Sequence, residues 1–201
     1  MRVLLLGATG FVGRHVLSCL VERGCHTVWC FVRGDASQGA RERVHFVHGD
    51  TGSQTDLEAA IRESGCQCVV NLAGCYAWWL ADPSQFGAAN VQATANILAA
   101  VKAAGVALVH VSTVLAYGRP VGATDSTLGL SEESAFREDA SPGPTTSLYA
   151  SSKQAGDELV RQALSQGIKG CICYLACCVG ADPKLLSEEK DVMRIRDLVE
   201  G

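Results

Sequence analysis

The sequence predicts an α/β fold in which helices cover both faces of a parallel sheet, and two observations support this. Short apolar runs alternate along the chain with longer segments whose apolar residues recur at helical spacing. A glycine-rich turn joins the first apolar run to the first helical segment, close to the N-terminus. Consecutive parallel strands need a crossover connection, which is usually a helix, so this alternation predicts a doubly wound parallel sheet.

The predicted elements follow one another without internal repeats or low-complexity tracts. Six strands are expected at Arg2–Leu6, Thr27–Val32, Val44–Val47, Cys68–Leu72, Val106–Val111 and within Ile168–Val179. Four helices are expected at Phe11–Leu20, Asp56–Ile61, Ala88–Ala104 and 148–166, with glycine stops such as Gly24 and Gly105. The loop Gly118–Thr146 is long and rich in Ser, Thr, Gly and Pro, and loops of that length are usually functional or mobile.

The composition bounds the class of protein. The 201 residues suffice for one hydrophobic core, with 48% hydrophobic and 19% charged residues. A net charge of −4 without a basic stripe argues against nucleic acid as the main partner. No apolar run approaches the roughly 18 residues of a membrane-spanning helix. The ten cysteines lack metal-binding spacing and fall mostly in apolar stretches, which predicts free buried thiols, no metal and a reducing, cytoplasmic location.

The glycine turn carries the first functional signal. A strand, a glycine turn and a helix form the context in which such a motif indicates a dinucleotide site on a Rossmann-type sheet. Gly7 allows the tight turn, Gly10 lets a pyrophosphate approach the backbone, and Gly13 lets helix and strand pack closely. The alternative is a turn that serves packing only. The expected cofactor-binding residues here are Gly7, Thr9, Gly10, Phe11, Val12 and Gly13.

The tip of the second strand bears on the choice of cofactor. Enzymes that use NAD usually place a carboxylate there to hold the ribose 2′-hydroxyl. This chain has Val32 followed by Arg33, while Asp35 lies past the tip. An arginine can pair with a 2′-phosphate, so the sequence favours NADP(H) over NAD(H). The alternative is a solvated arginine in a loop.

Two further strand ends complete the expected cofactor surface. Asp50, followed by Thr51, lies where the third strand ends and could reach an adenine, although a turn aspartate is the alternative. The small residues that follow Leu72, namely Ala73 and Gly74, would let a cofactor lie close to the fourth strand. The aromatic residues Tyr76, Trp78 and Trp79 come next, and they either wall a substrate pocket or serve packing.

A second constellation points to proton chemistry. Tyr149 and Lys153 are four residues apart on one helix face, behind Thr113 at the end of the fifth strand. A phenol has a pKa near 10, and a neighbouring ammonium lowers it by favouring the phenolate. Lys153 could do this while holding a nicotinamide ribose, and the Thr113 hydroxyl could polarise a carbonyl beside Tyr149. A surface helix pair is the alternative for Tyr149 and Lys153 taken alone.

Together these features resemble the extended short-chain dehydrogenase/reductase family, which is epimerase/dehydratase-like. The resemblance is greatest to the branch with dihydroflavonol reductases and 3β-hydroxysteroid dehydrogenases. Beyond the glycine turn and the Tyr149–Lys153 pair, the matching stretches are Val70-Asn71-Leu72-Ala73-Gly74, Asn90-Val91-Gln92-Ala93-Thr94-Ala95-Asn96, Ser112-Thr113 with Tyr117-Gly118, Tyr76-Ala77-Trp78 with Asp82-Pro83, and Gly180.

The resemblance implies specific roles. Tyr149 is the acid–base residue, Lys153 binds ribose and lowers the Tyr149 pKa, and Thr113 orients the substrate. Asn90 supports the lysine side, and Arg33 reads the 2′-phosphate. The family also implies a homodimer that forms through the helices at 88–104 and 148–166.

Three departures from the family qualify the resemblance. Ala93 replaces a usual glycine, and Tyr174-Leu175 stands where the family has an Arg-Pro pair beside the nicotinamide. The chain ends at Gly201, whereas the family implies roughly another hundred residues. We therefore expect a dinucleotide-binding domain over 1–180 and, over 181–201, the start of a substrate lobe that is largely missing.

Three functions remain open. The first is an NADP(H)-dependent oxidoreductase that interconverts a secondary alcohol and a ketone, with Tyr149 as acid–base residue. The second is a nucleotide-sugar epimerase or dehydratase that uses the nicotinamide transiently. The third is a non-catalytic cofactor-binding or regulatory protein. The sequence does not identify the small-molecule substrate.

Overall fold

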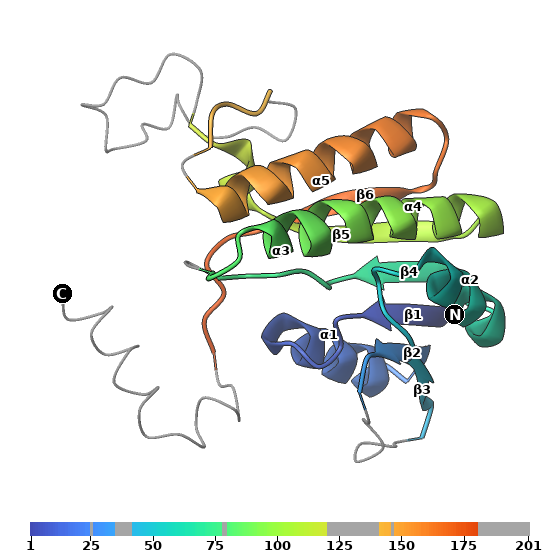
Figure 1. Ribbon diagram of the computed structural model, residues 1–201. Helices are drawn as coiled ribbons and strands as arrows, with labels where there is room; N and C mark the ends of the chain where they lie inside the picture. Colours follow the sequence, from blue (N-terminus) through green and yellow to red (C-terminus); the bar gives the residue numbers. More distant parts are fainter. Residues whose placement is uncertain (25, 35–41, 78–79, 120–140, 146, 181–201) are drawn as a thin grey trace.

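The structure is a computed structural model that describes residues 1–24, 26–34, 42–77, 80–119, 141–145 and 147–180 (Figure 1). Six strands form one sheet in the order β3-β2-β1-β4-β5-β6, and every neighbouring pair is parallel. The strands are β1 (Arg2–Leu6), β2 (Thr27–Val32), β3 (Val44–His48), β4 (Cys68–Asn71), β5 (Ala107–Thr113) and β6 (Gly170–Leu175).

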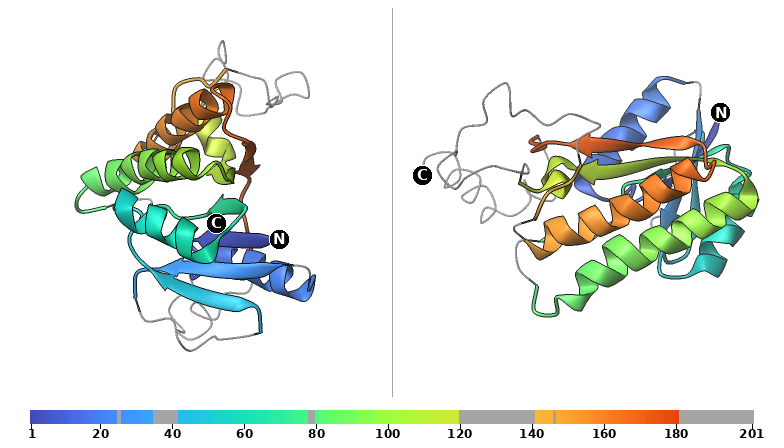
Figure 2. Two further views of the ribbon diagram at one scale, coloured as in Figure 1. Left: turned by 90° about the vertical axis from the view of Figure 1, so that its right-hand side faces the viewer. Right: turned by 90° about the horizontal axis from the view of Figure 1, so that it is seen from above.

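Helices cover both faces of this sheet, as the sequence predicts (Figure 2). One face packs against α1 (Phe11–Glu22), and the other packs against α2 (Gln54–Ser64), α4 (Ala93–Ala104) and α5 (Leu148–Ser165). Shorter helical pieces are α3 (Ser84–Phe86), the π-helical η2 (Gly87–Gln92) and the 3₁₀-helical η3 (Val114–Tyr117).

Alternating side chains of β1 show why the strand needs cover on both sides. Leu5 lies in the cluster beneath α1, while Leu4 and Leu6 lie in the cluster beneath α2, α4 and α5. All three are fully buried, because side chains alternate between the two faces of a strand. A continuous apolar run therefore marks a central parallel strand.

The strand order places a binding crevice beside β1. From β1 the chain winds outward to β2 and β3, then returns to β4 on the other side of β1 and continues to β5 and β6. Ligands of open α/β sheets bind at the carboxyl ends of the strands where the winding direction reverses. This point lies between β1 and β4, directly above the glycine turn.

The glycine turn is tightly constrained by its neighbours. Gly7 has φ +80°, and a Cβ there would lie 2.7 Å from the Leu72 carbonyl carbon. A Cβ on Gly13 would collide with the carbonyl oxygen of Gly7. Glycine at these two positions lets α1 start directly above β1 and lets the chain after β4 pass beside the turn, as predicted.

Two helices begin earlier than the sequence predicts, and a side-chain cap explains one of them. The helical run expected from Ala88 already starts at Ser84, where Asp82 Oδ1 accepts the Ser84 N–H at 3.0 Å but the N-cap residue, Pro83, makes no side-chain hydrogen bond. The helix expected from Asp56 starts at Gln54, because Ser53 Oγ accepts the Asp56 N–H at 3.2 Å. The helical spacing of apolar residues predicted the middle of each helix but not its polar first turn.

Several expectations lie outside the described residues. These are Trp78 and Trp79 of the aromatic segment, positions 120–140 of the long loop, and the predicted start of a substrate lobe at 181–201. Within the described ranges, no helix has the length and apolar character needed to cross a membrane. The nine described cysteines are free thiols, and Cys19, Cys171, Cys173, Cys177 and Cys178 are exposed rather than buried as expected.

The contact at Gly13 predicts the effect of adding one methyl group. Gly13→Ala should lower the free energy of unfolding by about 1–3 kcal/mol, because the new Cβ overpacks α1 against the turn. Gly87→Ala is the matched control. No atom lies within 4 Å of its added Cβ, and alanine favours the helix by about 0.5–1 kcal/mol. Urea unfolding of both variants measures the difference, and equal stabilities would contradict the close packing.

Candidate cofactor and catalytic site

A cavity of about 580 Å³ opens at the carboxyl ends of β1, β4, β5 and β6. It receives residues from the glycine turn, the segments after β4 and β6, the end of β5 and the first two turns of α5. The predicted site residues that line it together are Gly7, Gly10, Phe11, Val12, Gly13, Leu72, Ala73, Gly74, Asn90, Thr113, Tyr149 and Lys153. The two constellations seen in the sequence thus belong to one site.

The glycine turn forms one end of the cavity. Gly10 donates its N–H to the Gly7 carbonyl at 3.1 Å and is the N-cap residue of α1, where no side chain caps the helix. The first N–H groups of a helix have no partner within that helix, and they bind phosphate readily. The turn and the first turn of α1 therefore fit the pyrophosphate of a dinucleotide.

The segment after β4 forms the floor beside this turn. Asn71 Oδ1 accepts the Ala73 N–H at 3.0 Å and fixes the start of the segment. Asn90 fixes its end, because it accepts the Cys75 N–H at 2.8 Å and donates to the Cys75 carbonyl at 3.0 Å. The small residues Ala73 and Gly74 between these two clamps leave room for a cofactor.

Asn90 contributes to the site through hydrogen bonds that fix the position of the backbone. Besides the clamp on Cys75, it donates to Ser152 Oγ at 2.9 Å, and Ser152 in turn donates to the Tyr149 carbonyl at 2.7 Å. Its hydrogen bonds thus tie the β4 segment to α5, one residue before Lys153. Asn90 thus reaches the part of α5 that precedes Lys153, and its support of the lysine side stays a prediction.

Thr113 ends β5 and lines the cavity. Its Oγ1 accepts the Leu115 N–H at 3.3 Å and so caps η3. Because this bond uses only an oxygen lone pair, the hydroxyl hydrogen remains available to a substrate carbonyl.

Tyr149 lies in the first turn of α5, where Ser147 Oγ accepts the Ala150 N–H at 3.1 Å. Its ring meets the Tyr76 ring edge-on, with centroids 5.0 Å apart, and lies 6.3 Å from the Phe86 ring. Burial raises the pKa of Tyr149 above 10, and the nearby Tyr76, Asp157 and Cys75 add to the increase. The expected lowering of this pKa by Lys153 is therefore not what the structure shows.

Lys153 explains that difference. Its side chain is buried, with 7% exposed, and its Nζ donates to the Val111 carbonyl at 3.0 Å. Burial lowers the pKa of the ammonium, while the Asp157 carboxylate raises it. The Lys153 ammonium thus interacts with the backbone of β5 and with the Asp157 carboxylate, which lies one helical turn further along α5.

A buried polar network, which the sequence interpretation missed, lies below Lys153. Asp157 is fully buried, accepts the Ser112 hydroxyl at 2.7 Å and lies 3.4 Å from His110 Nε2. His110 Nδ1 lies 3.1 Å from Asn71 Nδ2, so the network reaches the clamp on Ala73. The spacing Tyr149, Lys153, Asp157 was the available signal, since it places three polar residues on one buried helix stripe.

Four predicted cofactor residues do not line the cavity: Thr9, Arg33, Asp50 and Thr51. Arg33 is exposed just beyond β2. Asp50 Oδ1 accepts the Gly52 N–H at 2.7 Å, and Asn96 Nδ2 donates to the Thr51 carbonyl at 3.1 Å. This geometry agrees with the alternative of a turn aspartate, and an adenine contact stays a prediction.

Comparison with known proteins identifies the family. The model of the NAD dependent epimerase/dehydratase family matches residues 3–198. The chain belongs to this family. Its assignment to the branch with dihydroflavonol reductases stays a prediction.

Two curated proteins are also similar to this chain in sequence. The chain is 30% identical over 190 residues to a UDP-glucose 4-epimerase of Azospirillum brasilense, covering 90% of this chain and 50% of the other. It is 30% identical over 184 residues to a dTDP-6-deoxy-L-talose 4-dehydrogenase (NAD(P)(+)) of Kitasatospora kifunensis, covering 90% and 53%. The chain therefore spans about half the length of these curated relatives.

A solved structure agrees with the fold. The UDP-glucose 4-epimerase of Thermus thermophilus, in complex with NAD, superposes with a TM-score of 0.68 at 28% identity. The match covers 87% of this chain and 54% of the other.

The departure at Tyr174-Leu175 changes one wall of the epimerase/dehydratase site. Tyr174 does not line the cavity; its hydroxyl accepts a hydrogen bond from Arg161 at 2.7 Å, and its ring centroid lies 4.6 Å from that of Tyr117. The wall is formed instead by Leu175, Ala176, Cys177 and Cys178. Gly180 then returns to the ring of Phe11, so this wall reaches the glycine turn.

Metal ligands do not gather anywhere in the described ranges. No cluster of three or more His, Cys, Asp or Glu side chains there could hold an ion.

Proposed function

We propose that this chain forms the cofactor-binding and catalytic half of an oxidoreductase that interconverts a secondary alcohol and a ketone. The observation that carries the proposal is a single cavity lined by Thr113, Tyr149 and Lys153 together with the glycine turn. A hydroxyl, a phenol and an ammonium beside a dinucleotide cradle are the groups that carbonyl reduction needs.

The residues divide the work of carbonyl reduction. A nicotinamide cofactor held by the glycine turn would supply a hydride to the carbonyl carbon. Thr113 would orient the substrate by donating a hydrogen bond to the carbonyl oxygen, and Tyr149 would transfer its phenolic proton to that oxygen. The raised pKa of Tyr149 keeps the phenol protonated at neutral pH, which suits this direction. Lys153 lines the same cavity, and its ammonium would hold the ribose of a bound nicotinamide cofactor.

The second candidate is a nucleotide-sugar epimerase or dehydratase, which the similarity to UDP-glucose 4-epimerases favours. Thr113, Tyr149 and Lys153 would serve either function, because both reactions transfer a proton to or from an oxygen of the sugar or alcohol. Absorbance at the reduced-nicotinamide band separates them, since an epimerase converts substrate without a net change in cofactor. A non-catalytic cofactor-binding role would leave every tested substrate unconverted. A cytoplasmic location stays a prediction from the cysteine content.

Tyr149→Phe should lower turnover of the best substrate by roughly 10²–10⁴-fold, because it removes the proton donor while keeping the ring against Tyr76. Steady-state assays with a panel of ketones and nucleotide sugars measure the loss, and cofactor titration checks that the variant still binds. Tyr174→Phe is the matched control, since its hydroxyl binds Arg161 outside the cavity and turnover should not change. Undiminished activity in Tyr149→Phe would remove the phenol from the mechanism.

The cofactor preference rests on Arg33. We expect it to favour NADP(H), because an exposed guanidinium at the tip of β2 can pair with a 2′-phosphate. The relatives leave this open, since one is named as NAD(P)(+)-dependent and one solved structure contains NAD.

Arg33→Ala should weaken NADPH binding by roughly tenfold, as the loss of one charge-assisted hydrogen bond predicts, and leave NADH binding unchanged. Titration of the 201-residue chain by cofactor fluorescence measures both affinities. Arg23→Ala, which removes an exposed arginine at the far end of α1, controls for net charge. If wild type binds NADH as tightly as NADPH and Arg33→Ala changes neither, the cofactor is not selected here.

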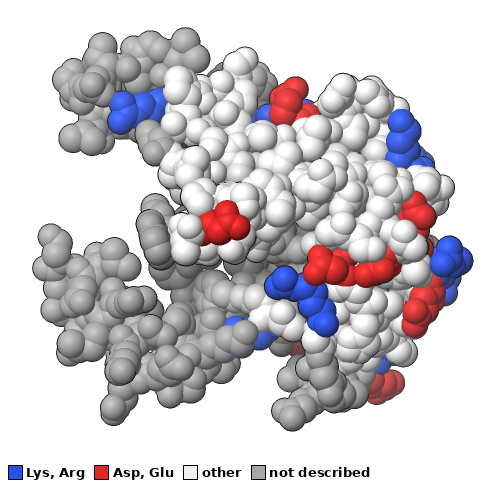
Figure 3. Space-filling view, in the orientation of Figure 1, with Lys and Arg blue, Asp and Glu red and all other residues white. Residues whose placement is uncertain are grey.

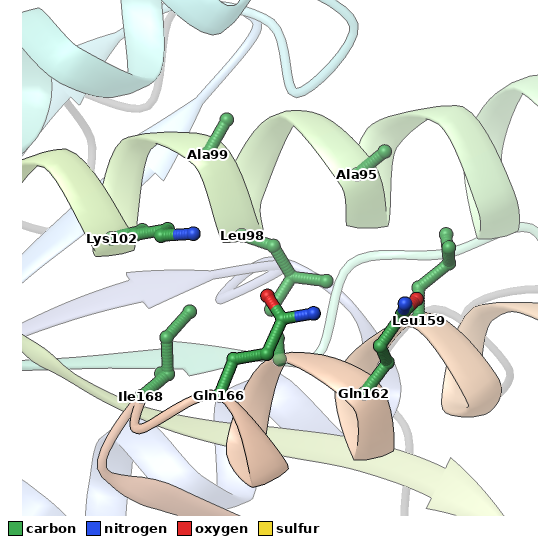
Figure 4. Close-up of a pocket in the computed structure, with 9 residues that line it drawn as sticks. Ala95, Leu98, Ala99, Lys102, Leu159, Gln162, Gln166 and Ile168 are labelled. Carbon is green, nitrogen blue, oxygen red and sulfur yellow. The ribbon is translucent and has the colours of Figure 1, made fainter.

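The proposed homodimer has a matching surface. A groove of about 340 Å³ runs between α4 and α5, and its lining residues include Ala95, Leu98, Ala99, Leu159 and Ala163 (Figure 4). The surface over these helices carries few charged side chains, which gather mainly at its right-hand end and below (Figure 3). Six of the nine lining residues are apolar, and a mostly apolar groove between two helices suits a self-complementary interface between two copies.

Ala163→Glu should convert a dimer into a monomer, because it places a carboxylate in the apolar groove between copies. Ser165→Glu adds the same charge two residues on, at an exposed position outside the groove lining, and should leave the dimer intact. Light scattering after gel filtration gives both masses. A wild-type chain that stays monomeric at high concentration would contradict the interface.

A further inference from the structure

The buried network below Lys153 contains more charge than the proposed chemistry requires. Asp157 has none of its surface exposed, and a carboxylate at such a position must be compensated by hydrogen bonds and by a positive charge. Ser112 supplies a hydrogen bond at 2.7 Å, and His110 Nε2 lies 3.4 Å from the other oxygen. Asp157 Oδ1 and His110 Nε2 have no other partner among the described residues, so they face each other.

The directions of the hydrogen bonds along the network determine which ring nitrogen of His110 carries the proton. The Ala73 N–H can only donate, so Asn71 Oδ1 accepts it and the Asn71 amide nitrogen faces His110. His110 Nδ1 must then accept, which places the ring proton on Nε2, toward Asp157. Burial lowers the pKa of His110 and Lys153 adds to this, and together they outweigh the Asp157 carboxylate, which raises it; the imidazole is therefore mostly neutral at pH 7. It orients the carboxylate but does not neutralise it.

Among the described residues, Lys153 is the remaining cation near Asp157. It lies one helical turn from Asp157 on the same buried stripe, where side chains four residues apart are neighbours. Its Nζ donates to the carbonyl of Val111. Val111 lies between His110 and Ser112 in β5, and both of these residues contact the Asp157 carboxylate. Arg161, one turn beyond Asp157, faces Tyr174 and Glu158 instead.

We propose that Asp157 is the buried counter-charge that keeps Lys153 protonated, and that His110 and Ser112 hold it in place. Asn71 joins this unit to the backbone of Ala73 in the cofactor cavity. The inference deepens the proposed function, and it makes Asp157 and His110 positioning residues that act through Lys153. Other titratable groups around the unit are Tyr149 on α5, Cys75 and Tyr76 after β4, Tyr117 on η3, and Tyr174 on β6.

The first test reads the lysine directly and needs no substrate. The chain has five lysines, so ¹³Cε-labelled lysine gives few NMR signals, and the Lys153 signal is the one lost in Lys153→Arg. Asp157→Asn should move the titration of Lys153 to lower pH by at least about one unit, because burial then acts on the ammonium unopposed. Glu158→Gln removes the same charge at the next, exposed position and should leave the titration unchanged. An unchanged Lys153 titration in Asp157→Asn overturns the proposal.

A double-mutant cycle keeps the idea testable if Asp157→Asn folds poorly. Lys153→Met leaves a buried carboxylate, Asp157→Asn leaves a buried ammonium, and the pair of changes leaves neither. The double variant should therefore unfold at a higher temperature than either single variant. If Asp157→Asn does not fold, the double variant should regain a cooperative transition. A double variant no more stable than the singles, or one that stays unfolded, contradicts the counter-charge.

Activity gives a third readout with its own meaning. In Asp157→Asn, the basic limb of the pH–rate profile should move to lower pH, because Lys153 loses its proton earlier. If Tyr149→Phe proves fully active but the Lys153 titration shifts as described, the network stands and the proposed reaction does not. If turnover depends on Tyr149 but the titration does not move, the reaction stands and the counter-charge role is wrong.

Discussion

The close approach of the glycine turn to the chain after β4 is the constraint on which the site depends. Gly7 lies against the backbone of Leu72 and Ala73, and no side chain fits between them. The contact brings the ends of β1 and β4 together at the point where the winding of the sheet reverses. It also leaves the start of α1 open toward the cavity. The fold and the phosphate cradle thus follow from the same packing requirement.

The second half of the site is organised by the contact between β5 and α5. Alternate residues of β5 face the helix, and every fourth residue of the helix faces the strand, so two polar stripes meet. Leu108 and Val160 close the inner end with apolar contact, while Thr113 and Tyr149 open onto the cavity. Between these ends lie Ser112, His110, Lys153 and Asp157, all buried. Polarity therefore increases from the core of the sheet toward the reacting groups.

The sequence allowed the sheet, its helices and most of the cavity to be predicted, because those features follow periodic or local rules. Apolar runs marked the strands, and fixed glycine spacing marked the turn. The missed features depend on partners far apart in the chain. His110 reads as one polar residue in a strand, and only the register of β4 beside β5 brings Asn71 to its ring. Burial raises the pKa of Tyr149, and Tyr76, which lies against its ring after the end of another strand, adds to the increase. Arg33 lies just beyond β2, as expected, and is exposed, so its role in cofactor choice stays a prediction.

The base and the rim of the cavity are built from different kinds of side chain. Apart from Met1, the exposed large apolar residues in the described ranges all lie at the rim or next to it: Tyr76, Val114, Leu115, Leu148 and Val179. Lys153, to which we assign a role in the reaction, is instead buried below that rim and donates to the Val111 carbonyl. Proton chemistry needs groups held to within fractions of an ångström, which buried networks provide, whereas exposed apolar side chains adapt to what covers them. This arrangement agrees with the proposed function, in which buried side chains at the base carry the chemistry and the exposed apolar rim contacts the substrate.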